Sequence, residues 1–173
     1  MSDVLRLNSS YRAAIAEFLR GDQLATDFIC RIFSVLHIWD DLIDKDKSVS
    51  QDEIHGAFWT ALIDLPANSF YQRHIAALHP ILVAAILNWQ AANSFEELVE
   101  DSLAPESIRQ KQLSIAFILR GTYIDLLSMA AFLVGGYEWA AQVVPKIRTW
   151  AHAETFSEYL ISLKLEAEAR RNV

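Results

Sequence analysis

The chain has 173 residues, a net charge of −7 and a hydrophobic content of 53%. This length is typical of one domain, and this hydrophobic content is sufficient for a substantial core. The acidic charge excludes proteins whose main task is to bind nucleic acid, because they need a basic surface. Glycine and proline are scarce, and Ala, Leu, Ile and Glu are abundant, which favours helices. We predict a single helical domain spanning residues 1–173.

Several features indicate a cytoplasmic protein without a membrane anchor. The single cysteine, Cys30, cannot form an intrachain disulfide bond, which fits a reducing compartment, and its apolar neighbours predict that it is buried. The first eight residues carry Asp3 and Arg6 and lack the apolar segment of a signal peptide. The longest stretch without charged residues, 74–95, contains Pro80 and three amide side chains, which make it a poor membrane span.

Two helices are predicted near the start of the chain, at 10–19 and 22–43, with Gly21 between them. In the second helix, nine of the twelve residues at 28–39 are apolar. A helix that is hydrophobic almost all round is a core helix, so we place it at the centre of the fold.

A third helix is predicted to begin after Ser50 and to run to Asp64, because Ser50 and Glu53 have the spacing of a capping box. Apolar residues share one face of this helix, and they are Ile54, Phe58, Ala61 and Leu62. The segment 65–68, which contains Pro66, is predicted to break the chain after it.

Prolines and glycines divide the rest of the chain. The predicted helices in this part are 68–78, 80–100, 105–134, 137–150 and 154–170. Pro80 is predicted to open a helix, Gly121 to interrupt one, Gly136 to help end one and Pro145 to kink one. No strand pattern is present, and long helices with short connections predict an all-α, antiparallel helical bundle of about seven to eight helices.

An acidic cluster ends the second predicted helix. Its residues are His37, Asp40, Asp41 and Asp44, which lie within roughly 100° of one another on one helical face. Carboxylates at a helix C-terminus are disfavoured by about 0.3–1 kcal/mol each, so a compensating cation is expected. We interpret the three aspartates as a site for Mg²⁺ or Mn²⁺, with His37 beside it as a ligand-binding candidate. The alternative is an exposed helix end whose charges Lys45 and Lys47 neutralise.

The sequence Asp40-Asp41-Leu42-Ile43-Asp44 resembles the DDxxD motif of isoprenoid (terpenoid) synthases. These are all-α enzymes in which aspartates on helices hold Mg²⁺ against a substrate diphosphate. The resemblance implies a terpenoid-synthase-like fold and a metal-binding role for the three aspartates. The chain is shorter than these enzymes and has no second DDxxD, and Asn93, Ser94 and Glu97 have the wrong spacing for the family's other motif. The segment 39–44 is also similar to small uncharacterised phage or prophage proteins, a likeness that implies no activity.

Other predicted helices carry candidate partners for this cluster. Four residues of the helix 80–100 are alternative metal ligands, or groups that bond to such ligands: Asn93, Glu96, Glu97 and Glu100. The alternative is that these acids form the solvated end of an amphipathic helix. Arg120 lies on an apolar face, so it needs either a phosphate-containing ligand or an ion pair with a clustered acid. Tyr123 and Asp125 are candidates for the same polar pocket.

The leading hypothesis is a divalent-metal-binding helical protein that acts on or binds a small molecule containing phosphate or diphosphate. In an enzyme, the cations would neutralise charge that develops on the leaving diphosphate. The alternative is a non-catalytic helical interaction protein, homo-oligomeric and phage-encoded, whose acids are structural or bind a partner's basic groups. The mean hydropathy of +0.17 favours this alternative, because it indicates more apolar surface than a lone domain buries. The sequence leaves enzymatic activity open.

Overall fold

The computed structural model describes residues 9–44, 47–101, 105–152 and 154–171, and it describes the side chains of these residues except at 98–101 and 166–171. The described residues are helical apart from short turns and connections, and they contain no strand. The prediction of an all-α fold is confirmed. The predicted number of helices and the terpenoid-synthase-like arrangement stay predictions.

The chain forms two compact units. Unit 1 comprises residues 1–79 and 126–145, and unit 2 comprises residues 80–125 and 146–173. Two long helices contain residues of both units: α5 (Ser69–Asp101) begins in unit 1 and ends in unit 2, whereas α7 (Ile124–Ala151) begins and ends in unit 2 and belongs to unit 1 at 126–145. The single domain expected from chain length stays a prediction.

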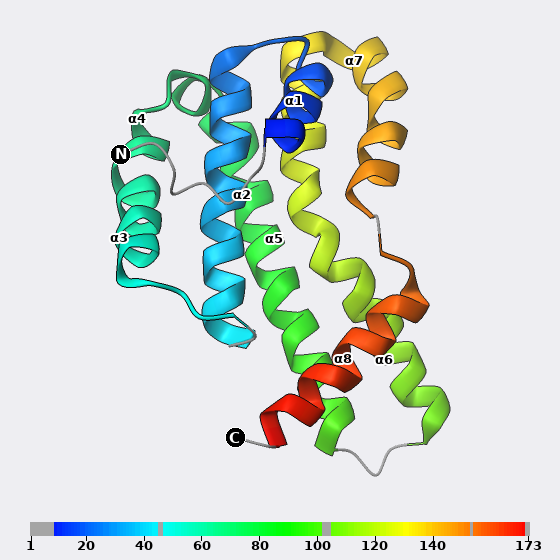
Figure 1. The fold of residues 1–173 in the computed structure, drawn as a ribbon. Helices are drawn as coiled ribbons and strands as arrows, with labels where there is room; N and C mark the ends of the chain where they lie inside the picture. Colours follow the sequence, from blue (N-terminus) through cyan, green and yellow to red (C-terminus); the bar gives the residue numbers. More distant parts are fainter. Residues whose placement is uncertain (1–8, 45–46, 102–104, 153, 172–173) are drawn as a thin grey trace. The chain divides into compact units, whose positions relative to one another are not determined.

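Unit 1 is built on helix α2 (Gln23–Asp44). The elements that contact it include α1 (Ser9–Phe18), α3 (Gln51–Trp59), the π-helical turn η1 (Thr60–Asp64) and the short helix α4 (Leu65–Ala67). In the view of Figure 1, α1 and α3 lie on opposite sides of α2. Phe28, Ile29 and Phe33 are almost fully buried, as is Cys30. The central position predicted for this helix is therefore confirmed within unit 1.

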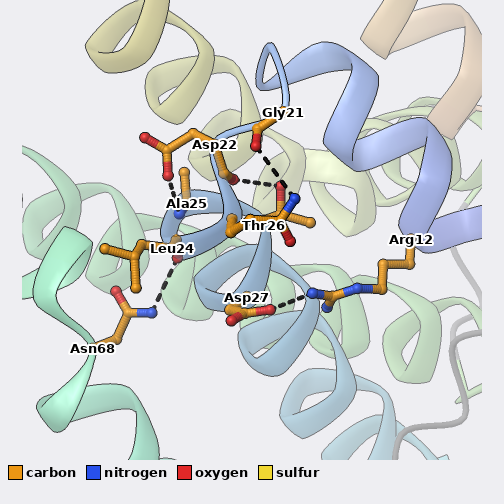
Figure 2. Close-up of polar contacts among 9 residues, drawn as sticks. Arg12, Gly21, Asp22, Leu24, Ala25, Thr26, Asp27 and Asn68 are labelled. Atoms are coloured by element: carbon orange, nitrogen blue, oxygen red, sulfur yellow. Dashed lines mark hydrogen bonds and ion pairs between the residues drawn. The ribbon is translucent and has the colours of Figure 1, made fainter.

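Polar contacts fix the start of α2 (Figure 2). Asp22 caps the helix, since its carboxylate accepts a hydrogen bond from the backbone of the third helical residue at 2.9 Å. The side-chain amide of Asn68 donates to the carbonyl of Leu24 at 3.0 Å, and Arg12 of α1 pairs with Asp27. These contacts join α1 and the segment before α5 to the first turns of α2.

Helix α3 begins with the predicted capping box. The backbone nitrogen of Ser50 donates to the carboxylate of Glu53 at 2.8 Å, and the Ser50 hydroxyl accepts from the Glu53 backbone at 3.3 Å. The apolar face predicted for this helix does not turn inward as one set, because Phe58 and Leu62 are exposed while Ile54 is partly buried. The partly buried side of the segment carries the small residues Ala57, Thr60 and Ala61 instead.

Helix α5 continues through Pro80, so the predicted start of a new helix at this proline is wrong. The backbone leaves helical geometry at His74, with φ −118° and ψ 15°. A proline lacks an N–H donor and crowds the carbonyl four residues before it, here that of residue 76, whereas the break lies at His74, six residues before Pro80. The ring of His74 packs against Phe70, with ring centroids 4.8 Å apart. Residues 65–67 are helical and Asn68 is extended, so the break predicted at 65–68 is confined to Asn68.

In the rest of the chain, breaks in the helices occur at the predicted glycines, whereas Pro145 does not end its helix. Helix α6 (Glu106–Arg120) begins after Pro105, and the interruption predicted at Gly121 is the 3₁₀ turn η2 (Gly121–Tyr123). Within α7, Gly136 has φ 76° and ψ −174°, a conformation that favours glycine, and it breaks the helix where an end was predicted. Pro145 lies inside α7. In unit 2, α8 (Phe156–Arg171) packs against α6 (Figure 1).

Two stretches of the described helices are long and apolar enough to cross a membrane, at 69–97 and 106–165. In the first, the most apolar window has a mean hydropathy of 1.5, and 17% of it is buried. A core helix of a water-soluble protein has the same length and composition, so these properties alone do not place either stretch in a bilayer. The cytoplasmic location stays a prediction.

Candidate functional sites

The four residues of the predicted acidic cluster have different surroundings. His37 is exposed, and its Nδ1 lies 2.7 Å from the carbonyl oxygen of Phe33. Asp40 and Asp44 are partly buried. Asp41 is buried, with 7% of its surface exposed. A shared helical face therefore does not give these side chains a shared environment.

The carboxylate of Asp41 lies near a cation from the connection that follows α2. The Nζ atom of Lys47 is 3.5 Å from Asp41 Oδ1, and the lysine side chain is largely exposed. Such an exposed partner contributes little stability, but it offsets part of the negative charge at the helix end. This contact supports the alternative in which lysines neutralise the cluster. Lys45, the other lysine of that alternative, lies outside the described residues.

Within the part of the chain that the structure describes, no three His, Cys, Asp or Glu side chains are arranged so that they could hold a metal ion. Asp40, Asp41 and Asp44 are included in this statement. Oxygen ligands of Mg²⁺ must converge on one point about 2.0–2.1 Å from each of them. Binding of a cation by the three aspartates would therefore require their side chains to move, and the metal site stays a prediction.

Glu96 joins three helices of unit 2. Its Oε2 accepts a hydrogen bond from Arg120 Nη1 at 2.6 Å, and its Oε1 accepts from the Tyr159 hydroxyl at 2.5 Å. The side chains of Arg120 and Glu96 are 25% and 11% exposed, and Tyr159 is buried. Charge-assisted hydrogen bonds that are largely shielded from water are strong. Arg120 therefore has an acidic partner, Glu96, as its apolar helical face required.

Tyr159 was not singled out from the sequence, because its partner lies 63 residues away. It packs with Ala92 and Ala116 in the core of unit 2, and its ring centroid is 5.2 Å from that of Phe117. Burial, and then the hydrogen bond to Glu96, raise the pKa of its hydroxyl. This surrounding of small and aromatic side chains indicates a structural tie between α5, α6 and α8.

The other candidates on α5 do not join this network through any contact that the structure describes. The side-chain oxygen of Asn93 is buried without a hydrogen-bond partner among the described residues. Glu97 is exposed, and the side chain of Glu100 lies outside the described residues. Of these predicted ligands, Glu96 is therefore the one whose polar contacts are described, with Arg120 and Tyr159.

Two further candidates, Tyr123 and Asp125, follow Arg120 in the sequence. Tyr123 is partly buried in η2. Asp125 forms an ion pair with Arg148, both in α7 and in unit 2. The polar pocket predicted around Arg120, Tyr123 and Asp125 and the role of Tyr123 as a ligand-binding residue both stay predictions.

A surface that the sequence did not indicate lies on α3 and η1. Four large apolar side chains are exposed there: Phe58 by 62%, Trp59 by 54%, Leu62 by 67% and Ile63 by 48%. We call these four residues the α3–η1 face. Their spacing of one and four residues places them on one side of the helical segment. The signal in the sequence was the run 54–63, which has no Asp, Glu, Lys or Arg on either side of the helical segment.

One carboxylate holds this face in place. Asp64 Oδ1 accepts a hydrogen bond from the indole nitrogen of Trp59 at 3.2 Å, and its Oδ2 accepts from Arg31 of α2. The indole is thus fixed on the surface by a group that also joins η1 to α2. Holding an aromatic ring in one orientation lowers the entropy cost of ordering it when a partner binds.

No family model, no curated protein sequence and no solved structure matches this chain. The resemblance of residues 40–44 to the DDxxD motif therefore stays a prediction.

We expect Arg120→Ala to lower the free energy of unfolding by about 2–4 kcal/mol, because it leaves the largely buried carboxylate of Glu96 without its cation. Arg109→Ala is the matched control, since Arg109 lies on the same helix and pairs with exposed Glu106. Its loss should stay below about 0.5 kcal/mol. Urea denaturation measures both values. Similar losses in the two variants would contradict a structural role for the Arg120 pair.

The free energy of unfolding is expected to fall as the pH rises above 10.0, the ordinary pKa of the tyrosine hydroxyl. The pKa of Tyr159 is raised in the folded protein, so the folded state keeps this proton while the unfolded chain releases it. Because the unfolded state then binds fewer protons, stability decreases with pH. Tyr159→Phe should show a shallower decrease between about pH 9 and 11 in urea denaturation. Equal slopes for the variant and the wild type would refute this expectation.

Proposed function

We propose that this protein is a non-catalytic interaction protein and that the α3–η1 face is its binding surface. The observation that supports this most directly is the orientation of the segment. Its large apolar side chains Phe58, Trp59, Leu62 and Ile63 point outward, whereas its partly buried side carries mostly small residues. Helix α3 has no buried residue at all. In a typical surface helix of a water-soluble protein, the large apolar side chains face the core instead.

The energetic argument rests on the size of these side chains. Fully burying one Leu, Ile or Phe side chain is worth roughly 1.5–3 kcal/mol. Because four side chains of this size stay about half exposed, several kcal/mol of burial free energy is not gained on folding. A partner that covers them would gain this free energy on binding. Contiguous exposed apolar groups on water-soluble proteins commonly mark interaction sites.

The order of the face adds to this argument. Trp59 is fixed through Asp64, so its ring needs little further ordering when a partner binds. Tryptophan is also among the residues that most often dominate binding energy. The face extends onto η1, and π-helical turns occur frequently at functional sites.

A photo-crosslinking residue in place of Leu62 tests this proposal in the protein's native cells. We expect a discrete covalent adduct with a second polypeptide chain, because the side chain at position 62 would lie inside the contact. Ala13, which is exposed on α1, is the control position and should give no such adduct. The proposal would be overturned if illumination gave no adduct at position 62, or if position 13 gave the same adduct.

A second candidate function is the binding of Mg²⁺ or Mn²⁺, and through it a phosphate-containing small molecule, by Asp40, Asp41 and Asp44. The burial of Asp41 at the C-terminal end of α2 favours it. Carboxylates there face the negative end of the helix dipole, and a divalent cation would offset this repulsion. Arg120 already pairs with Glu96, so this second candidate rests on the three aspartates rather than on Arg120 as a phosphate ligand.

Titration of Mg²⁺ or Mn²⁺ while thermal unfolding is followed tests the second candidate. A cation that binds the folded state stabilises it by about 1.4 kcal/mol at ten times its dissociation constant. We expect stabilisation of the wild type and none in Asp40→Ala/Asp44→Ala. Potassium chloride at matched ionic strength controls for screening. Equal responses of the two proteins, or no response of the wild type at millimolar cation, would count against metal binding.

A further inference from the structure

We infer that the partner of the α3–η1 face is an amphipathic helix of another protein, with lysine or arginine residues at one end of its apolar side. This inference rests on the proposed function, because it names the kind of partner that the same surface binds. The shape of the face, the lack of charge across it and the acidic groups at one end of it support the inference.

The shape of the face favours a helix as its partner. The four side chains form one side of a helical segment about 9 Å long, since six residues rise about 1.5 Å each. A ridge of this kind packs against the side chains of another helix. The described residues of unit 1 contain no strand, so within them there is no sheet edge to which a partner could add a strand.

The middle of the face and one of its ends require an apolar partner. Residues 54–63 include no Asp, Glu, Lys or Arg, so this segment itself places no carboxylate, ammonium or guanidinium group opposite the centre of the partner. At the end nearest Asp64, the carboxylate already pairs with Arg31 of α2. A charge on the partner at this end would therefore be desolvated without a matching group.

The other end of the segment is acidic. Five carboxylates are carried by the last turns of α2 and the first turn of α3, and they are Asp40, Asp41, Asp44, Asp52 and Glu53. These two helices contact each other and are joined by residues 45–50. Lys47 offsets the charge of Asp41 in part. Cationic groups within about 8 Å of this end gain attraction, whereas an acidic helix or an anionic lipid surface is repelled.

A second copy of the chain fits the face less well. The four side chains expose on the order of 100 Å² each, so two copies paired through them would bury roughly 800–1,000 Å² in total. Stable interfaces bury at least about 1,200 Å². A longer helix from another protein reaches beyond the four residues to the acidic end and adds charged contacts there.

The probe is a fluorescein-labelled synthetic helix of about 18 residues, or five turns, with leucines along one side and lysines at one end of that side. A second peptide carries glutamates in place of the lysines. Fluorescence polarisation measures binding to the wild type, to the face variant Leu62→Ser/Ile63→Ser and to the charge variant Asp44→Asn/Asp52→Asn. The control is Tyr137→Ser, which removes an exposed apolar side chain elsewhere in unit 1.

We expect the lysine peptide to bind the wild type and Tyr137→Ser with equal affinity. The face variant should bind it at least about tenfold more weakly, which corresponds to about 1.4 kcal/mol. The charge variant should bind it about threefold to tenfold more weakly and with less dependence on salt. The glutamate peptide should bind the wild type at least about tenfold more weakly than the lysine peptide. Circular dichroism should show unchanged folding of the face variant, because the replaced side chains are exposed.

The inference is overturned if the wild type does not bind the lysine peptide, if it binds both peptides equally, or if the face variant binds as the wild type does. It is also overturned if light scattering shows wild-type dimers that the face variant cannot form, or if phosphatidylcholine vesicles retain the wild type but not the face variant. The crosslink at position 62 separates these outcomes from the proposed function. An adduct without peptide binding leaves the interaction surface in place with another kind of partner, whereas the absence of both removes the two proposals together.

Discussion

The burial of α2 is the constraint on which unit 1 depends. Its apolar residues are distributed almost all round the helix, so every neighbouring element must cover part of it. The segment of α3 and η1 does this with a side of mostly small residues and is anchored by the pair of Arg31 and Asp64. Packing a small-residue side against α2 leaves the larger side chains of the same segment outside. The α3–η1 face is thus exposed because the opposite side of the same segment packs against α2.

The two units use carboxylates in different ways. In unit 2, Glu96 accepts hydrogen bonds from Arg120 and Tyr159, and these groups are largely shielded from water. Its role is to hold α5, α6 and α8 together. In unit 1, Asp64 accepts from Arg31 and from the exposed indole of Trp59. Its role is to hold a surface residue in a fixed orientation, which connects the packing of the unit to its proposed binding function.

The two candidate functions differ in how much rearrangement they require. Cation binding needs Asp40, Asp41 and Asp44 to converge, and the described side chains do not hold such an arrangement. Partner binding needs no change in the α3–η1 face, because its side chains already point outward and the Trp59 indole is held by Asp64. The acidic residues retain a role in the second case as charges beside an apolar contact. We prefer partner binding as the function because it requires less rearrangement of the described side chains than cation binding does.

The sequence by itself determined the helical class, the capping box at Ser50, the burial of α2 and the interruptions at Gly121 and Gly136, because these depend on local propensity and on periodicity. It did not determine which side of the segment 54–63 faces inward, since neither side carries Asp, Glu, Lys or Arg and only contact with α2 selects one. Nor could it identify Glu96 as a partner of Arg120, because several acids were available and only the packed structure brings this one within hydrogen-bond distance. Local chemistry fixes the elements, but orientation and pairing arise only when segments far apart in the chain pack together.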